Sequence, residues 1–145
     1  MTDDARIDPA EAHAKMTSDG FTYVDVRTEE EFAEGHPAGA CNVPFLVGGP
    51  SGMSPNADFV AVMSGAFAKD TPLVLGCKAG ARSAKARAAL VAAGFTNVLD
   101  QRAGWDGARG PFGELTVPGW SRTSLPTEGG LPEGRRYADL RAKRA

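Results

Sequence analysis

The sequence is poor in the residues on which disulfide-rich and metal-binding folds depend. Its 145 residues include two cysteines, Cys41 and Cys77, and two histidines, His13 and His36. Two cysteines are too few for a disulfide framework, and no group of His, Cys, Asp and Glu has the spacing of metal ligands. We therefore expect no bound metal and no cofactor.

Long apolar runs and a dominant charge are missing as well. No segment approaches the length needed to span a membrane, and the acidic N-terminus is not followed by the apolar stretch of a secretory signal. The formal net charge of −2 gives no reason to expect binding to nucleic acid or to a membrane. Localisation in the cytoplasm is the default expectation.

One stretch has no acidic residue. The range 71–99 contains neither Asp nor Glu, and its basic residues are Lys78, Arg82, Lys85 and Arg87. Lys78 and Arg82 lie close to the second cysteine and are expected to face an anionic substrate. The other two lie in a segment with high helix propensity and are expected to be solvated.

The same stretch predicts a strand, a tight loop and a helix. The apolar run 73–75 indicates a buried strand, and Cys77 stands where that strand stops. Residues 77–82 form the loop, Ser83 opens the helix, and Gly94 closes it. Such a unit directs backbone N–H groups and the positive end of a helix at one point, which stabilises a thiolate. We predict that Cys77 is a nucleophile, although a lone cysteine is more often an inert core residue.

The remaining elements alternate in type along the chain. Asp8 and Thr28 each begin a capping-box pattern, which predicts a helix after each. Residues 46–55 are rich in Gly, Pro and Ser and are expected to form a loop, whereas 56–67 shows helical spacing. Short strands are expected at 21–26, 40–43, 73–75 and 95–99. This alternation predicts an α/β fold with a central, mostly parallel sheet and helices on both faces.

The end of the chain differs in composition. After Gly110, Gly, Pro, Ser and Thr dominate, with isolated apolar residues between Phe112 and Leu125. We assign 1–110 to one domain and 111–145 to an extension packed on it. Phe112 to Leu125 are expected to cover one edge of the core, and a short basic helix is expected at 137–143.

The length of the cysteine loop bears on the chemistry. Four residues separate the cysteine from the arginine: Lys78, Ala79, Gly80 and Ala81. In cysteine phosphatases the corresponding ring of amides is one residue longer. A shorter ring encloses less volume, which suits one added sulfur atom better than a tetrahedral phosphate. Sulfur transfer is therefore favoured, and a cysteine-based phosphatase or arsenate reductase is the less favoured alternative.

Four ordered motifs resemble the single-domain rhodaneses (thiosulfate sulfurtransferases). The segment 77–83, Cys-Lys-Ala-Gly-Ala-Arg-Ser, resembles their active-site loop. The other three motifs are Asp25-Val26-Arg27 with Glu31-Phe32, the Gly-His-Pro-Ala-Gly-Ala-Cys-Asn-Val-Pro run at 35–44, and Ala103-Gly104-Trp105. The resemblance covers roughly 7–110 and is closest to the plant senescence-associated type and its bacterial relatives. Pro37, Cys41 and Arg102-Ala103 depart from the pattern, and none of them removes the nucleophile.

The resemblance implies a rhodanese-like fold and a two-step sulfur transfer. Cys77 would take a sulfane sulfur from thiosulfate or a similar small anionic donor and pass it, as a persulfide, to cyanide or a thiol. The substrate-binding residues would be Lys78, Ala79, Gly80, Ala81, Arg82 and Ser83. Two alternatives remain: a persulfide carrier with a protein sulfur acceptor, and a non-catalytic module, which the intact loop makes least favoured.

Several further residues are expected to support the site without reacting. Asp25 and Arg27 are expected to brace the sheet edge through ion pairs and backbone hydrogen bonds. His36, at a Gly-His-Pro turn, is expected to act as a hydrogen-bonding brace rather than a base or metal ligand. Trp105 could pack over the loop, although an aromatic residue there is more often part of the core. Cys41 is most simply a core residue.

Overall fold

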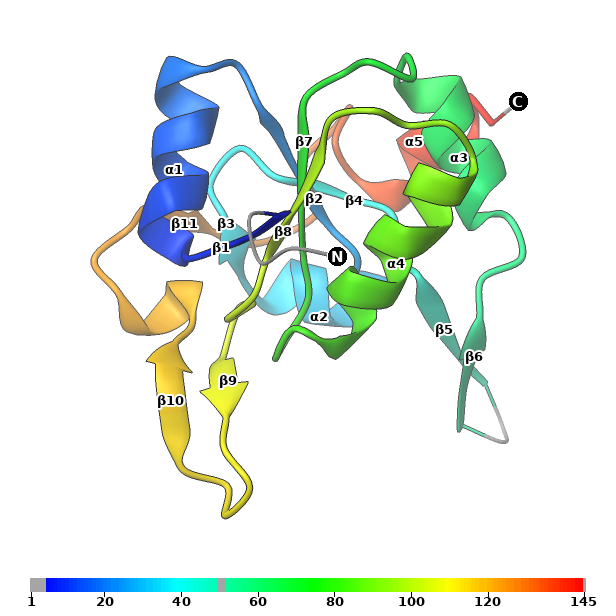
Figure 1. The fold of residues 1–145 in the computed structure, drawn as a ribbon. Helices are drawn as coiled ribbons and strands as arrows, with labels where there is room; N and C mark the ends of the chain where they lie inside the picture. Colours follow the sequence, from blue (N-terminus) through cyan, green and yellow to red (C-terminus); the bar gives the residue numbers. More distant parts are fainter. Residues whose placement is uncertain (1–4, 50–51, 145) are drawn as a thin grey trace.

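A five-stranded sheet forms the centre of the molecule (Figure 1) in the computed structural model, which describes residues 5–49 and 52–144. The strand order is β1-β8-β7-β2-β4, and every pairing is parallel. The expected α/β class is therefore confirmed. The strands are β1 (Arg6–Ile7), β2 (Thr22–Asp25), β4 (Cys41–Asn42), β7 (Leu73–Gly76) and β8 (Val98–Gln101).

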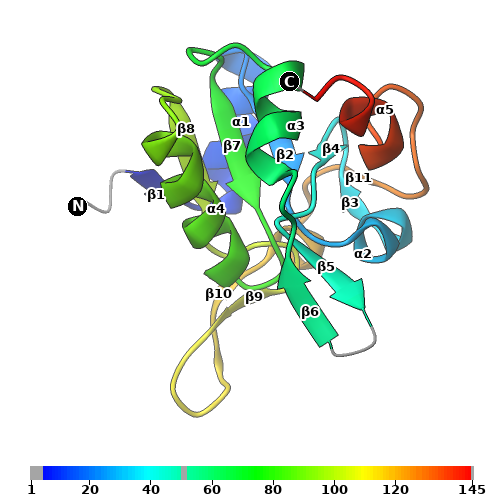
Figure 2. The same ribbon diagram turned by 90° about the vertical axis from the view of Figure 1, so that its right-hand side faces the viewer.

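Helices cover both faces of this sheet (Figure 2). Successive side chains of a strand point to opposite faces, so Leu73 and Leu75 join one buried cluster and Val74 joins the other. The first cluster contains residues of α3 (Phe59–Ala66), α4 (Ala81–Ala92) and α5 (Tyr137–Arg141), and the second contains residues of α1 (Pro9–Ser18) and α2 (Glu29–Glu34). None of the described helices is long and apolar enough to cross a bilayer.

The helix boundaries follow local signals closely. The Asp8 N–H donates to Glu11 Oε1 at 3.3 Å, and Thr28 and Glu31 form the reciprocal bonds of a capping box at the start of α2. Both predicted helix starts are confirmed. Helix α4 begins at Ala81, two residues before the expected start at Ser83, because Gly80 serves as its N-cap.

The strand expected at 95–99 is shifted in the structure. Strand β8 runs from Val98 to Gln101, and Phe95 instead lies just after α4, in the turn that closes the helix. Its N–H donates to the Leu90 carbonyl at 3.0 Å, while Gly94 has a φ of +102°, as in a glycine-closed helix terminus. The apolar side chain of Phe95 anchors this turn in the core. Its hydrophobicity therefore indicated burial correctly and secondary structure wrongly.

The loop expected at 46–55 is a β-hairpin. Strands β5 (Leu46–Gly49) and β6 (Gly52–Pro55) pair in antiparallel register, and the hairpin extends away from the sheet (Figure 2). Its glycine and proline content is typical of loops. A two-stranded ribbon outside the core tolerates those residues because its pairing does not depend on burying apolar side chains.

The C-terminal segment is more regular and more deeply packed than expected. Strand β9 (Gly107–Arg109) pairs with β10 (Leu115–Pro118), and β11 (Thr127–Glu128) pairs with β3 (His36–Pro37). Trp120 is fully buried and packs edge-on against Tyr23 at a ring distance of 5.5 Å. The expectation that Phe112 to Leu125 cover the core is wrong for Phe112, which is 94% exposed at the tip of the β9–β10 hairpin, and right for Trp120 and the partly buried Leu125. The basic terminal helix is α5, Tyr137–Arg141.

Candidate active site

Cys77 lies immediately after β7, in the loop that leads into α4. The side chain is 2% exposed. Its Sγ accepts hydrogen bonds from the N–H groups of Gly80 at 3.1 Å and Ser83 at 3.3 Å, and Ser83 Oγ lies 3.5 Å away. Gly80 has a φ of +101°, a conformation that favours glycine. The loop therefore presents N–H groups to the sulfur, an arrangement that stabilises a negative charge there.

The turn after β8 supports this loop from below. The Trp105 N–H donates to the Cys77 carbonyl at 2.7 Å, and the Asp106 N–H donates to the Lys78 carbonyl at 2.9 Å. A Cβ atom at Gly104 would collide with the Cys77 and Lys78 carbonyls. Gln101 holds the turn in place, because its Oε1 accepts from the Ala103 and Gly104 N–H groups at 2.8 and 3.0 Å. The backbone of the Trp105 turn thus forms the floor of the cysteine loop, in the sense that its N–H groups bind the loop's carbonyls.

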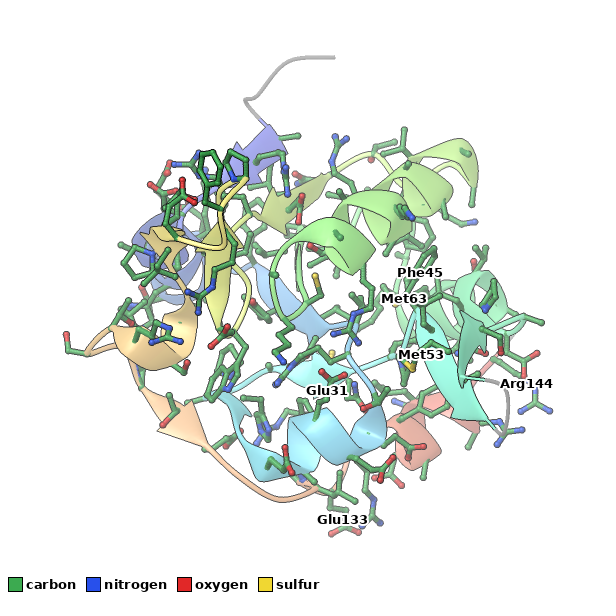
Figure 3. All side chains as sticks on the ribbon, turned by 90° about the horizontal axis from the view of Figure 1, so that it is seen from below. Glu31, Phe45, Met53, Met63, Glu133 and Arg144 are labelled. Carbon is green, nitrogen blue, oxygen red and sulfur yellow. The ribbon has the colours of Figure 1, made fainter. Side chains whose placement is uncertain are left out.

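Arg82 forms a two-point ion pair with Glu31 of α2. Its Nη1 and Nη2 donate to Oε1 and Oε2 at 2.8 and 3.1 Å, and Figure 3 shows Glu31 between α2 and α4. Partial burial raises the pKa of Glu31, but hydrogen bonds from Arg82 and Thr28 and the charge of Arg82 outweigh it and lower the pKa to about 2. Both terminal nitrogens of Arg82 are therefore engaged, and contact between Arg82 and a donor molecule stays a prediction.

Lys78 stands exposed at the mouth of the loop, between two hollows. The larger, of about 660 Å³, lies between α2 and the β5–β6 hairpin. Met53 of the hairpin, which is labelled in Figure 3, lines it. The smaller, of about 230 Å³, is lined in part by Trp105 and Ser121. Lys78 and Glu31 border both hollows. Ala79 and Ala81 are exposed on the rim, whereas Gly80 and Ser83 are buried. Of the two basic loop residues, Lys78 is exposed, whereas Arg82 is half-buried and paired with Glu31; contact of Lys78 with an anion stays a prediction.

Asp25 and Arg27 form a buried ion pair at the carboxyl end of β2. Arg27 Nη2 donates to Asp25 Oδ2 at 2.7 Å and to the Gly35 carbonyl at 2.6 Å, and its guanidinium lies over the Trp105 ring at 5.2 Å. Asn42 Nδ2 donates to the carbonyls of both Asp25 and Arg27. These contacts tie β2, β4 and the Trp105 turn together, which is the bracing geometry expected of the pair.

His36 is fully buried and links α2 to the C-terminal segment. Its ring stacks on Phe32 with centroids 3.6 Å apart. Nδ1 lies 2.6 Å from the Phe32 carbonyl oxygen, and Nε2 lies 3.2 Å from Glu128 Oε2. Arg135 also pairs with Glu128, and its hydrogen bonds are the largest cause that lowers the pKa of Glu128 to about 2. His36 therefore occupies the position of a brace.

Cys41 lies in the core and does not have the properties of a reactive thiol. It is 4% exposed, and burial raises the pKa of its thiol to about 12. Sγ lies 3.6 Å from the Tyr23 carbonyl oxygen. In the described ranges 5–49 and 52–144, no three His, Cys, Asp or Glu side chains gather as metal ligands do.

Three residues of the site were not anticipated in these roles. The capping pattern explained Glu31 locally and gave no sign of its pairing with Arg82. Gln101 ends strand β8, and only its buried hydrogen bonds mark it as the residue that holds the Trp105 turn. Ser121 comes from the C-terminal segment, where its Oγ donates to the Trp105 carbonyl at 2.6 Å. The Glu31 and Ser121 contacts join residues 51 and 16 positions apart, whereas Gln101 bonds to residues two and three positions away.

Comparison with known proteins decides the family. The model of the rhodanese-like domain matches residues 8–109. The chain belongs to the rhodanese family. It is 37% identical over 132 residues to thiosulfate sulfurtransferase 16, chloroplastic, of Arabidopsis thaliana, an alignment that covers 88% of this chain and 99% of that protein. It is 36% identical over 120 residues to the senescence-associated protein DIN1 of Raphanus sativus, covering 83% of this chain and 59% of that protein.

The solved structures agree with this assignment. The crystal structure of Rv0390 from M. tuberculosis has a TM-score of 0.67 and 25% identity, with coverage of 86% of this rhodanese and 97% of that chain. The resemblance to single-domain rhodaneses is thereby confirmed, and with it the rhodanese-like fold. As a member with an intact cysteine loop, the chain is a sulfurtransferase.

Proposed function

We propose that this rhodanese transfers a sulfane sulfur from thiosulfate, or a similar small anionic donor, through a persulfide on Cys77 to a thiophilic acceptor. The observation that carries the proposal is the pair of N–H groups, from Gly80 and Ser83, that donate to Cys77 Sγ. The sulfur sits where backbone donors favour a thiolate before the reaction and a charged terminal sulfur after it.

The first step forms the persulfide. The Cys77 thiolate attacks the outer sulfur of thiosulfate, so that a bond forms between Sγ and that sulfur. The sulfur–sulfur bond of thiosulfate breaks, and sulfite leaves with the electron pair. Lys78 is exposed at the mouth of the loop, where its ammonium group favours the approach of the donor's anionic oxygens. The rim residues Ala79 and Ala81 are too small to obstruct this approach.

The second step returns the enzyme to its starting state. Cyanide or a thiolate attacks the terminal sulfur, the persulfide bond breaks, and Cys77 regains its thiolate. No metal or cofactor is needed for either step, since the donor carries the reactive sulfur and the leaving sulfite takes the electron pair.

The second candidate is a persulfide carrier that exchanges sulfur with a protein acceptor. The observation in its favour is the hollow of about 660 Å³ between α2 and the β5–β6 hairpin, which opens beside the cysteine loop and is bordered by Leu46 and Met53. It offers space for more than a small anion. The two candidates share the persulfide and differ in which donors turn over.

Steady-state sulfur transfer tests the proposal. We expect turnover of thiosulfate with cyanide, loss of that activity in Cys77→Ser, and retention in Cys41→Ser, because burial keeps the Cys41 thiol unreactive. Turnover with protein persulfide donors but not with thiosulfate would favour the carrier. Full activity in Cys77→Ser would overturn the mechanism.

A further inference from the structure

The side chain of Arg6 joins the first strand to the cysteine loop. Arg6 begins β1, where it pairs in register with Asp100 of β8. Its Nε donates to Asp100 Oδ2 at 2.8 Å, and its Nη2 donates to the Gly80 carbonyl at 3.1 Å. One guanidinium group therefore connects a sheet edge with the loop residue whose N–H contacts the nucleophile. Arg6 lies outside the range 8–109 that the family model matches.

Asp100 fixes Arg6 because it is buried and charged. The carboxylate is 1% exposed, whereas the side chain of Arg6 is 37% exposed. Among the described residues, Asp100 Oδ1 has no hydrogen-bond partner that satisfies normal geometry, and the ion pair between Oδ2 and Arg6 compensates the burial together with the Ser83 hydroxyl. A buried carboxylate without a cationic partner is costly. The ion pair therefore gives Arg6 a strong reason to keep this position.

Gly80 is contacted by Arg6 from outside the loop and its helix. Its φ is +101°, and glycine moves between this and other backbone conformations more easily than any other residue. Its N–H donates to Cys77 Sγ, while its carbonyl accepts from Arg6 Nη2 at 3.1 Å and from the Ala84 N–H and Ser83 Oγ, each at 3.4 Å. The shortest of these three carbonyl contacts comes from Arg6, and the other two come from α4 itself. Arg6 thus adds the contact that ties Gly80 to the sheet.

We propose that Arg6 and Asp100 are positioning residues for sulfur transfer. Asp100 holds the Arg6 guanidinium, and Arg6 holds the Gly80 carbonyl, so that the Gly80 N–H stays directed at Cys77 Sγ. Neither side chain contacts the sulfur. A donor is most effective when its orientation is fixed before the charge develops, and this pair fixes the orientation from beneath the loop. The catalytic part of the inference rests on the proposed persulfide chemistry.

Other charged groups also face this region and set the background of any pH profile. Arg82 of α4 is the nearby cation, and the Tyr23 phenol of β2 also lies close to Cys77 but is neutral, because burial raises its pKa. Asp100 faces Arg87 of α4 as well as Arg6, and the Ser83 hydroxyl interacts with its carboxylate. A variant of Arg6 leaves these groups in the chain but removes the cationic partner of Asp100, so a change in the behaviour of Cys77 is assigned to the Arg6–Asp100 pair.

The test compares Arg6→Gln and Arg6→Lys with Arg102→Gln. Arg102 and Arg6 both border a hollow of about 380 Å³ beside Gly80. Arg102 is 46% exposed and pairs with Asp8, and within residues 5–49 and 52–144 its side chain forms no hydrogen bond to the loop. Arg102→Gln therefore removes one positive charge nearby without releasing Gly80. Arg6→Lys keeps the charge, but a single ammonium group does not reproduce the two-point bridge.

Two readouts are needed. The first is the rate of Cys77 alkylation by iodoacetamide as a function of pH, measured in Cys41→Ser backgrounds. The second is kcat and KM for sulfur transfer from thiosulfate to cyanide, with thermal unfolding as a check that each variant is folded. For Arg6→Gln and Arg6→Lys we expect an alkylation profile shifted to higher pH and a kcat reduced about tenfold with little change in KM. This is less than the roughly 100-fold or greater effect of removing a donor outright.

The controls make the outcome decisive. Arg102→Gln is expected to match the parent in both readouts. If Arg6→Lys matched the parent, the bridge would be irrelevant and the proposal wrong; the same holds if Arg6→Gln and Arg102→Gln behaved alike. The alkylation readout needs no sulfur transfer, so it tests the positioning of Cys77 even if the parent protein fails to use thiosulfate.

Discussion

Arg82 and Glu31 meet in a two-point ion pair that fastens the first turn of α4 to α2, with donor–acceptor distances of 2.8 and 3.1 Å. Glu31 also accepts from the Thr28 N–H at 3.0 Å. One carboxylate therefore caps its own helix and holds the arginine at the end of the cysteine loop. The loop is held on one side by this pair and on the other by Arg6.

Replacing Glu31 should loosen the loop. In Glu31→Gln the amide oxygen still accepts from Thr28, but the ion pair with Arg82 is lost, so we expect the free energy of unfolding to fall by about 1–2 kcal/mol. Glu30→Gln removes the exposed carboxylate of the preceding residue and should leave stability within about 0.5 kcal/mol of the parent. Urea unfolding measures both. Equal stability of the two variants would contradict a holding role for Glu31.

The same ion pair predicts how stability depends on pH. The pKa values of Glu31 and Glu128 are lowered to about 2 from an ordinary value of 4.5. A carboxylate with a lowered pKa in the folded state stabilises the fold above its ordinary pKa, and this contribution is lost as pH falls toward the folded value. The melting temperature should therefore decline between about pH 4.5 and pH 2. The Glu31→Gln variant should show a shallower decline, and an identical slope would contradict the assignment.

Gly104 is predicted to be essential to the floor of the loop. A Cβ atom there would collide with the Cys77 and Lys78 carbonyls, and its φ of +65° disfavours other residues. Gly104→Ala should lower sulfur transfer at least about tenfold by displacing the loop. Gly20→Ala is the matched control, since Gly20 also has a positive φ, +71°, but open space around it. If both variants kept parental activity, the collision would have no catalytic consequence.

Trp120 is predicted to make the C-terminal segment part of the core. It is fully buried and its Nε1 donates to the Pro126 carbonyl at 2.9 Å. Trp120→Ala should lower the free energy of unfolding by about 3–5 kcal/mol, and truncation after Gly110 should lower the melting temperature further. Phe112→Ala, which changes a side chain that is 94% exposed, should have little effect. A truncated chain that melts with the full-length protein would show that the segment is dispensable.

Local patterns predicted much of this molecule because their causes are local. The capping boxes at Asp8 and Thr28, the glycine end of α4 and the cysteine at the end of β7 each depend on neighbours within a few positions. The rhodanese motifs then placed these parts in one fold. The hairpin at 46–55 was missed because glycine and proline indicate a turn without showing which flanking residues pair.

The contacts that position the loop could not be predicted in this way. Arg6 and Asp100 are 94 residues apart in the chain, and Arg82 and Glu31 are 51 apart. Charge and composition show that such residues seek partners, but the choice of partner depends on how the strands are ordered. Trp120 shows the same limit, because its segment resembles an irregular extension until its side chain is seen in the core.

The most direct test of the central claim is the intact mass of the reduced protein before and after treatment with thiosulfate. Parent and Cys41→Ser should each gain one sulfur atom, which cyanide removes, and Cys77→Ser should gain none. A gain of sulfur in Cys77→Ser, or no gain in the parent with thiosulfate or any other donor of sulfane sulfur, would contradict a persulfide enzyme built on Cys77.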